Sequence, residues 1–165
     1  MTSEIVNQWL QKAKDDYVSA TVLMEKVQPP QIEIACYHSQ QCAEKALKAF
    51  CSFKGSEIQK THNLIVLCQS CTALNSEFST LISDCAKLTP YSVPTRYPNT
   101  IEILESEAKS ALASAKKIYD FVEAKIAEHT TIKKSSGSTT MTTNLAAITP
   151  LLRQSGSGLS REHRS

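Results

Sequence analysis

The sequence predicts an all-α fold, an antiparallel up-and-down four-helix bundle followed by a disordered C-terminal tail. The chain of 165 residues holds only 4 Gly and 6 Pro, which is too few for the many turns of a β-sandwich. Apolar residues recur at steps of three and four, the period of a helix that buries one face. Four such stripes of comparable length, joined by short connections, can bury one another as a bundle.

The first two stripes predict two long helices. Ser3 can cap the first helix, and the Pro-Pro pair at 29–30 stops it. The second helix is expected from Ile32 to Phe53, with Gly55 in the position that follows a helix. The apolar positions of the first stripe are Val6, Leu10, Ala13, Tyr17, Ala20, Met24 and Val27, and those of the second include Ala35, Cys42, Ala46 and Ala49.

The third element of the bundle is expected to be two short helices, over 63–74 and 77–88, separated by Asn75 and Ser76. Three prolines then make 89–98 an extended loop, because each restricts its neighbour away from the helical region. The last helix is expected to start at Asn99 or Thr100 and to run to about Ile126. Its apolar positions are Ile101, Leu104, Ala108, Ala111, Ala115, Ile118 and Val122.

A change of composition divides the chain into a helical domain, 1–129, and a Ser/Thr-rich tail, 130–165. The tail has no aromatic residue and is expected to be disordered, because it cannot bury enough apolar area to offset its ordering entropy. It carries five basic residues against one acidic residue, a net charge of +4, which leaves −2 for residues 1–129 out of the total of +2. The helical domain therefore has no net basic excess that would attract a phosphate backbone.

Several classes of protein and site are not indicated. The N-terminus lacks a basic segment followed by an apolar one, and no apolar run is long enough to cross a membrane, so a cytoplasmic protein is expected. The six cysteines are expected to be thiols that pack as small hydrophobic residues. Cys68 and Cys71 form a single CxxC on an apolar face without a second pair, so neither a metal nor a cofactor is predicted.

The polar residues with the clearest pattern lie on the second helix. His38, Gln41 and Lys45 are spaced i, i+3 and i+7, which places them on one flank of its apolar stripe. The plainer interpretation is a helix flank at the boundary of the bundle or of a dimer. The functional interpretation is one wall of a site for a phosphate or nucleotide group, which offers a cation, an amide and an imidazole.

Two loops add further candidates. Thr61 can cap the next helix, and Lys60 beside the free amides of that helix could hold an anion. His62 is a candidate general base, although a histidine at a helix start more often makes a local hydrogen bond. In the proline loop Arg96 can bind phosphate or carboxylate in bidentate fashion or tie the loop to a helix, and Tyr91 and Tyr97 can stack on a base.

In the order and spacing of these blocks, residues 4–126 resemble a HEPN domain. The resemblance rests on Trp9 and Asp16 in the first helix, on the run Cys36-Tyr37-His38-Ser39-Gln40-Gln41-Cys42-Ala43-Glu44-Lys45-Ala46-Leu47-Lys48-Ala49, on Lys60-Thr61-His62-Asn63-Leu64, and on Tyr91 with Arg96-Tyr97-Pro98. It implies a helical bundle, a homodimer and a minimal nucleotidyltransferase as partner, often in a two-component module of the toxin–antitoxin type.

Many HEPN domains are metal-independent endoribonucleases with an arginine four to six residues before a histidine. No histidine follows Arg96 at that distance, so the resemblance favours the branch that binds nucleotides or partner proteins. The polar cluster it implies is His38, Gln41, Lys45, Lys60, His62, Arg96 and Tyr97. Two alternatives stay open: an RNase that uses His62 or His38 as base with Arg96 on the phosphate, and a structural dimer or scaffold.

Overall fold

The computed structural model describes residues 2–93 and 102–154, which form helices and connecting loops without a β-strand in that part of the chain. The elements follow the order α1 (Glu4–Glu25), α2 (Ile32–Phe53), α3 (Leu64–Leu74), η1 (Ser76–Leu81), α4 (Ile82–Leu88), η2 (Thr89–Ser92) and α5 (Glu105–Gln154). The chain divides into two units, Met1–Ile126 and Ala127–Ser165. The predicted helical bundle is confirmed, and it lies in the first unit.

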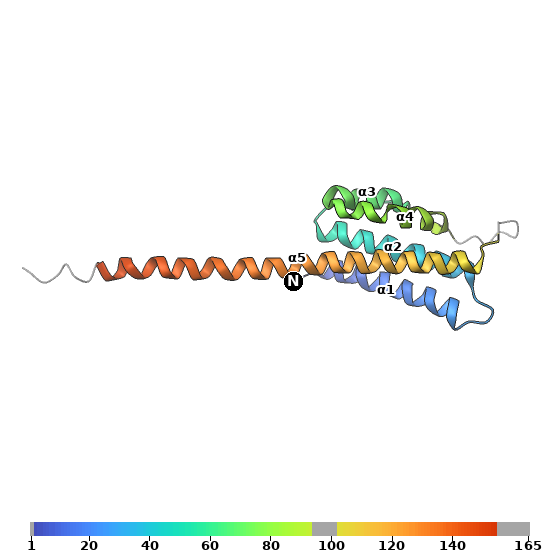
Figure 1. Cartoon of the computed structure of the whole chain (residues 1–165), viewed down its shortest axis with the longest axis horizontal. Helices are drawn as coiled ribbons and strands as arrows, with labels where there is room; N and C mark the ends of the chain where they lie inside the picture. Colours follow the sequence, from blue (N-terminus) through green and yellow to red (C-terminus); the bar gives the residue numbers. More distant parts are fainter. Residues whose placement is uncertain (1, 94–101, 155–165) are drawn as a thin grey trace, which may run out of the picture. The chain divides into compact units, whose positions relative to one another are not determined.

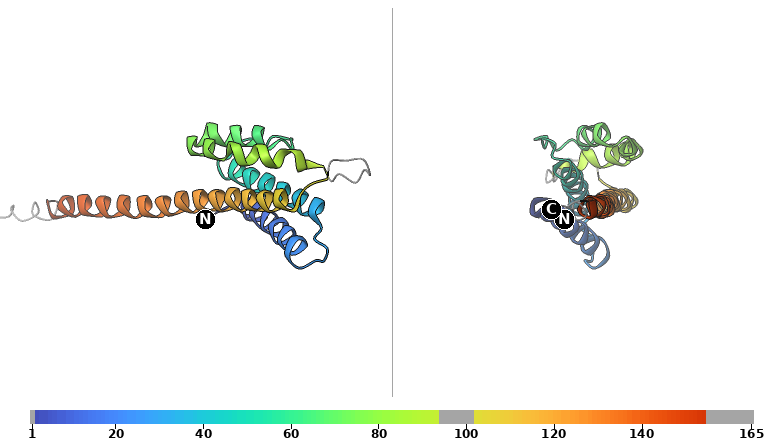
Figure 2. Two further views of the ribbon diagram at one scale, coloured as in Figure 1. Left: turned by 45° about the vertical axis from the view of Figure 1, so that its right-hand side comes forward. Right: turned by 90° about the vertical axis from the view of Figure 1, so that its left-hand side faces the viewer.

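The central element of this unit is α2, which lies between the α3 and α4 pair on one side and α1 on the other (Figure 1). The first part of α5 lies beside α4, as the end-on view shows (Figure 2). Burial agrees, because α2 has buried residues on several faces, among them Cys36, Gln40, Leu47 and Phe50. Phe50 and Phe78 of η1 stack with ring centroids 4.2 Å apart, and full burial of one such side chain stabilises a fold by about 1.5–3 kcal/mol.

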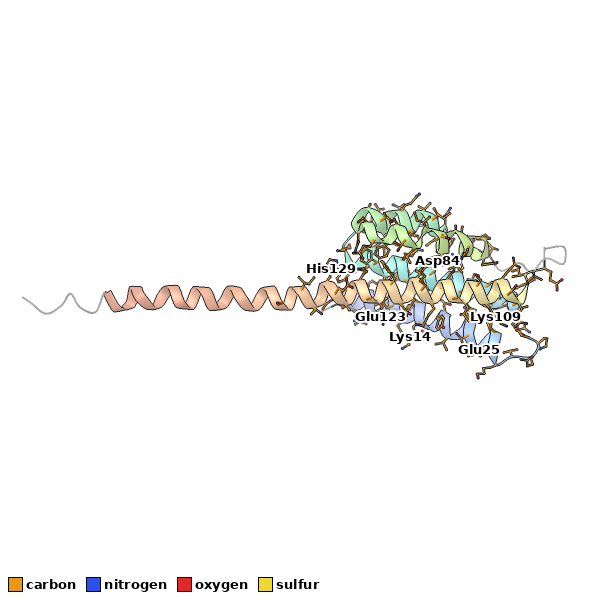
Figure 3. The ribbon with its side chains drawn as sticks, in the orientation of Figure 1. Lys14, Glu25, Asp84, Lys109, Glu123 and His129 are labelled. Atoms are coloured by element: carbon orange, nitrogen blue, oxygen red, sulfur yellow. The ribbon has the colours of Figure 1, made fainter. Side chains whose placement is uncertain are left out.

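Side-chain contacts give the helix directions. Asp16 of α1 contacts His38 while Lys48 lies over Trp9, so α1 and α2 are antiparallel. Asp84 of α4 accepts hydrogen bonds from Ser114 at 2.8 Å and from Lys117 at 2.7 Å, and it projects toward α5 (Figure 3). Glu77 pairs with Lys125 at 2.7 Å, so α4 and α5 are antiparallel as well. Helices α1, α2, α4 and α5 therefore form the predicted up-and-down arrangement.

Helix α3 is the short helix predicted over 63–74, but it does not form one bundle element together with α4. The carbonyl of His62, just before α3, accepts a hydrogen bond from Gln40, and Cys71 near its end lies against the carbonyl of Leu47. The later contact on α2 is thus made by the later residue of the α3 segment, so α3 runs parallel to α2. The segment 54–63 connects the end of α2 back to the level of Gln40, where α3 begins. This return begins at Gly55, whose positive φ of 67° fits the predicted role after a helix.

The last helix starts and ends at positions different from those expected. The expected starts, Asn99 and Thr100, lie outside the described residues, and α5 begins at Glu105, because the Glu107 carboxylate accepts a hydrogen bond from the Leu104 amide at 2.8 Å and caps the helix there. Leu104, expected on the buried stripe, is 60% exposed. The stripe from Ala108 to Ile126 is buried as predicted.

Helix α5 also continues to Gln154, where the pattern predicted an end near Ile126. An existing helix can extend into the residues that follow it without a new nucleation cost. Residues 130–154, which the sequence predicted to be disordered, are helical here as the continuation of α5, and residues 155–165 lie outside the described part.

Two local expectations are wrong. Thr89–Ser92 forms the 3₁₀ helix η2 instead of an extended loop, and Pro90 fits its first turn because proline needs no amide partner there. Ser3 occupies the N-cap position of α1 as predicted, but its side chain makes no capping hydrogen bond. Within the described residues, none of the helices has the length and apolar character that a membrane crossing requires.

Candidate functional site

The predicted flank of α2 is part of a continuous set of hydrogen-bonded side chains, here called the α2 polar network. Helix α1 contributes one residue, the loop before α3 contributes another, and α2 contributes the rest. The members are Asp16, His38, Gln40, Gln41, Glu44, Lys45, Lys48 and His62.

Asp16 is the centre of one half of the network. One carboxylate oxygen lies 2.8 Å from Nδ1 of His38, and the other accepts a hydrogen bond from Lys45. Because an ionised carboxylate only accepts, Nδ1 carries the hydrogen, and the Nε2 atom of a neutral ring is left with a lone pair. No partner of Nε2 occurs in the described part of the chain, and the His38 side chain is 28% exposed.

Glu44 is the centre of the other half, and its side chain is only 6% exposed. It accepts hydrogen bonds from Lys48 at 2.8 Å, from Gln40 at 3.1 Å and from Nδ1 of His62 at 3.1 Å. Burial by itself would raise the pKa of Glu44, but the hydrogen bonds from Lys48, Gln40 and His62 outweigh it and hold the pKa below its ordinary value. Glu44 is therefore an ionised carboxylate in the interior.

The amides of Gln40 and Gln41 connect the two halves. Gln41 donates to the side-chain oxygen of Gln40 at 2.8 Å and accepts from Lys45 at 3.3 Å. Gln40 also donates to the main-chain carbonyl of His62 at 3.1 Å, which fixes the loop before α3 to α2. Among the described side chains, no buried nitrogen or oxygen atom lacks a hydrogen-bond partner, so the buried atoms of the network are all satisfied within the chain.

This geometry limits what the network can do. Its two carboxylates, Asp16 and Glu44, balance the two ammonium groups of Lys45 and Lys48, so it does not attract anions through net charge. At the surface, the network exposes part of the Lys45 side chain, which is 22% exposed, and the imidazoles of His38 and His62. The Nδ1 atom of each imidazole bonds to a carboxylate. The network can therefore act on a ligand through hydrogen-bond donors and acceptors that are held in fixed positions.

Four of the predicted site residues, His38, Gln41, Lys45 and His62, come together in this network. Lys60 lies in the same loop as His62, is exposed, and makes no hydrogen bond or ion pair within the described residues. Arg96 and Tyr97 lie outside the described residues. Tyr91 lies elsewhere, beside a pocket of about 270 Å³ that is also lined by Lys87, Glu107, Ser110 and Ala111, and burial raises its pKa.

The sequence interpretation missed the carboxylates that organise the site, Asp16 and Glu44, together with Gln40 and Lys48. A signal for them was present. Asp16 falls between Ala13 and Ala20 on the buried side of α1, where a charged residue must find a partner. Glu44 lies between the buried Ala43 and Ala46 of α2.

The expected cap of α3 is wrong in one residue. Asn63 is the cap, and its side-chain oxygen accepts from the amides of Ile65 at 2.9 Å and Val66 at 3.4 Å. Thr61 instead accepts from the amide of Asn63 at 3.1 Å. Because Asn63 uses two amides of the first turn, the start of α3 is not the free anion site that Lys60 was expected to complete.

The cysteines pack in the core as predicted. Cys68 and Cys71 are buried, as are Cys36, Cys42, Cys51 and Cys85, and all six are free thiols. No group of three or more histidine, cysteine or acidic side chains that could hold a metal ion occurs in the described part of the chain.

Comparisons with known proteins agree with this architecture. The profile of the HEPN domain family matches residues 6–125. The crystal structure of ST0689, an archaeal HEPN homologue, has 26% sequence identity and a TM-score of 0.59, and the match covers 73% of this chain and 97% of that one. The crystal structure of TT1696 from Thermus thermophilus has 27% identity and a TM-score of 0.63, with 74% and 99% covered. No curated protein is similar enough to count as a match. The chain therefore belongs to the HEPN domain family.

Proposed function

We propose that this HEPN chain binds a nucleotide or another phosphate-bearing ligand at the α2 polar network, as the partner of a minimal nucleotidyltransferase in a two-component module of the toxin–antitoxin type. The observation that carries the proposal is that the Asp16 carboxylate bonds to both His38 and Lys45. These two contacts keep an imidazole and an ammonium group side by side at a partly exposed surface.

The donors that remain suit a phosphate-bearing ligand. The Lys45 ammonium has three hydrogens and uses two of them, on Asp16 and Gln41. Nε2 of His38 accepts from a ligand hydroxyl in its neutral form and donates to a phosphate oxygen when protonated. Lys60 supplies a further exposed cation from the loop, and the expected clamp from Arg96 with stacking by Tyr97 would add a bidentate contact.

The partner and the homodimer rest on membership of the family, and the cytoplasmic location stays a prediction from the sequence. Native mass spectrometry of the gently purified full chain tests the dimer and the partner together. A dimer that carries a nucleotide or a nucleotidyltransferase chain supports the proposal. A bare monomer at micromolar concentration contradicts both the dimer and the partnership.

Titration calorimetry with AMP and ATP tests the site itself. Lys45→Ala and Arg96→Ala are each expected to weaken binding about tenfold or more, the usual effect of losing a charged contact to phosphate. Lys14→Ala is the matched control, because Lys14 is exposed on α1 and takes no part in the network. Equal affinity in wild type and Lys45→Ala contradicts the site, and equal loss in Lys14→Ala shows nonspecific charge attraction instead.

A second candidate function, metal-independent RNA cleavage, is favoured by one specific observation. His38 and His62 are both held through Nδ1 by a carboxylate, Asp16 and Glu44 respectively, with Lys45 in the same network. One imidazole can take the proton of a ribose 2′-hydroxyl and the other can protonate the leaving oxygen, while the ammonium stabilises the charged phosphate.

Cleavage of a 5′-labelled RNA in the presence of EDTA tests this candidate. His38→Ala and His62→Ala are expected to abolish cleavage, and His129→Ala, outside the network, is expected to retain it. Activity that persists in both network variants, or no activity in the wild type, excludes this RNase mechanism and leaves the binding function.

A further inference from the structure

Four thiols that the proposed function does not use gather in the core between three helices. Cys51 comes from α2, Cys68 and Cys71 from α3, and Cys85 from α4, and each is at most 1% exposed. Their grouping is tight, since Cys51 makes a hydrogen bond with Cys71 and the interaction with Cys85 lowers the pKa of Cys68. Cys36 and Cys42 are buried too but make no hydrogen bond with a thiol within the described residues.

The best-defined pair is Cys51 with Cys71, whose Sγ atoms lie 3.6 Å apart. A disulfide needs about 2.0 Å between the sulfurs, so each has to move by less than about 1 Å. The two residues come from different helices that run in parallel, and Cys71 also lies 3.5 Å from the carbonyl of Leu47, one turn before Cys51. The contact therefore joins the second half of α3 to α2.

We propose that Cys51 and Cys71 are an oxidation site, at which a peroxide converts the two thiols into a disulfide that fastens α3 to α2. The Cys51 sulfur attacks one peroxide oxygen, the O–O bond breaks, and Cys51 becomes a sulfenic acid with release of hydroxide. The Cys71 sulfur then attacks Cys51, the S–O bond breaks and water leaves. The two thiols lose two electrons and two protons in total, and hydrogen peroxide becomes two water molecules.

The local environment favours this order of attack. The hydrogen bond with Cys71 lowers the pKa of Cys51 against the opposing effect of burial, while the bond with Cys51 and burial raise the pKa of Cys71. The Cys51 thiolate is thus the more readily formed nucleophile. Both residues are at most 1% exposed, so a small oxidant has to reach the pair through local opening of the core between α2 and α3.

The structure also distinguishes this pair from the CxxC of the sequence. Cys68 donates to the carbonyl of Phe78 at 3.3 Å, and within the described residues the Cys71 thiol bonds with Cys51 and not with Cys68. The disulfide expected from the structure therefore joins two helices, whereas a disulfide expected from the sequence motif would close within α3.

Oxidation of the folded wild-type chain with hydrogen peroxide, followed by peptide mapping without reductant, tests the proposal. The expected result is a Cys51–Cys71 linkage, the loss of two hydrogen atoms in the intact mass, and recovery of the original mass after dithiothreitol. A Cys68–Cys71 linkage, or thiols that stay reduced until the chain unfolds, overturns the proposal.

Variants separate the linkage from general oxidation. Cys71→Ala is expected to lose the linkage and to stop at a Cys51 sulfenic acid, which dimedone labels, while Cys42→Ala, a buried control, keeps the linkage. In the wild type, oxidation is expected to raise the midpoint of thermal unfolding, because a cross-link restricts the unfolded chain. If the midpoint of thermal unfolding is the same before and after oxidation, the disulfide does not stabilise the attachment of α3 to α2, and this part of the proposal is wrong even where the linkage forms.

Discussion

Asp16 and His38 are 22 positions apart in the sequence, yet the carboxylate of one holds Nδ1 of the other at 2.8 Å. The same carboxylate accepts a hydrogen bond from Lys45. A single acidic residue of α1 thereby fixes the orientation of an imidazole and an ammonium group on α2. The relationship joins two helices, and it also sets which ring nitrogen of His38 is available to a ligand.

Asp16→Asn is expected to lower the free energy of unfolding by about 2 kcal/mol, because it leaves Lys45 without its carboxylate in a largely buried setting. Chemical denaturation measures the change. Asp15→Asn is the control, since the Asp15 side chain accepts a hydrogen bond from Gln11 at the exposed face of α1, and such a surface change is expected to stay within about 0.5 kcal/mol. Similar values for the two variants would show that the Asp16 contacts add nothing to stability.

The pH dependence of stability is expected to follow Glu44. Its pKa in the folded chain lies below the ordinary value, because hydrogen bonds from Lys48, Gln40 and His62 outweigh burial. The stabilisation is therefore complete above about pH 4.3, the ordinary value for a glutamate, and is lost as the pH falls through the lower folded value. Asp84 acts in the same direction, because Lys117 and Ser114 outweigh its burial.

Thermal unfolding followed from pH 7 to acid measures this loss. Glu44→Gln is expected to be less stable at pH 7 and to show a shallower decline below about pH 4.3. Glu105→Gln, which removes an exposed carboxylate that pairs with Lys109, is expected to keep the wild-type decline. A Glu44→Gln profile parallel to that of the wild type would contradict the role of Glu44.

Gly55→Ala tests the turn that ends α2. The positive φ of 67° disfavours any residue with a Cβ, although the added atom would meet nothing within 4 Å. The expected loss is about 1 kcal/mol of unfolding free energy, all of it from backbone strain. Ser56→Ala next to it keeps the main-chain bond from Ser56 to Cys51 and is expected to be neutral. No loss in Gly55→Ala would mean that the turn can relax to another conformation.

Removal of residues 130–165 tests the division of the chain. The buried stripe of α5 ends at Ile126, so the shortened chain is expected to keep its thermal midpoint within about 2 °C, the shift caused by less than 1 kcal/mol. Circular dichroism of both chains gives the helix content of the removed part. A large fall in the midpoint would show that residues beyond 129 stabilise the bundle.

The sequence alone predicted the helices of the bundle and most of their buried faces, because an amphipathic repeat is a local property of the chain. It predicted the end of α2 at Phe53, with Gly55 in the turn that follows, for the same reason. It also placed His38, Gln41 and Lys45 on one helix flank, since their spacing by itself fixes that arrangement. The start of α5 at Glu105 and the cap of α3 at Asn63 were missed. Both depend on which of several nearby side chains accepts hydrogen bonds from the free main-chain amides of the first turn.

What only the tertiary structure decided is which residues meet across helices. The pairing of Asp16 with His38, of Glu44 with His62, and of Cys51 with Cys71 joins positions that no local pattern relates. Helix α3 is the clearest case, because its period showed that it is a helix but not that it runs parallel to α2. The physical reason is that a repeat records which face of a helix is buried, whereas the partner of that face is set by packing of the whole chain.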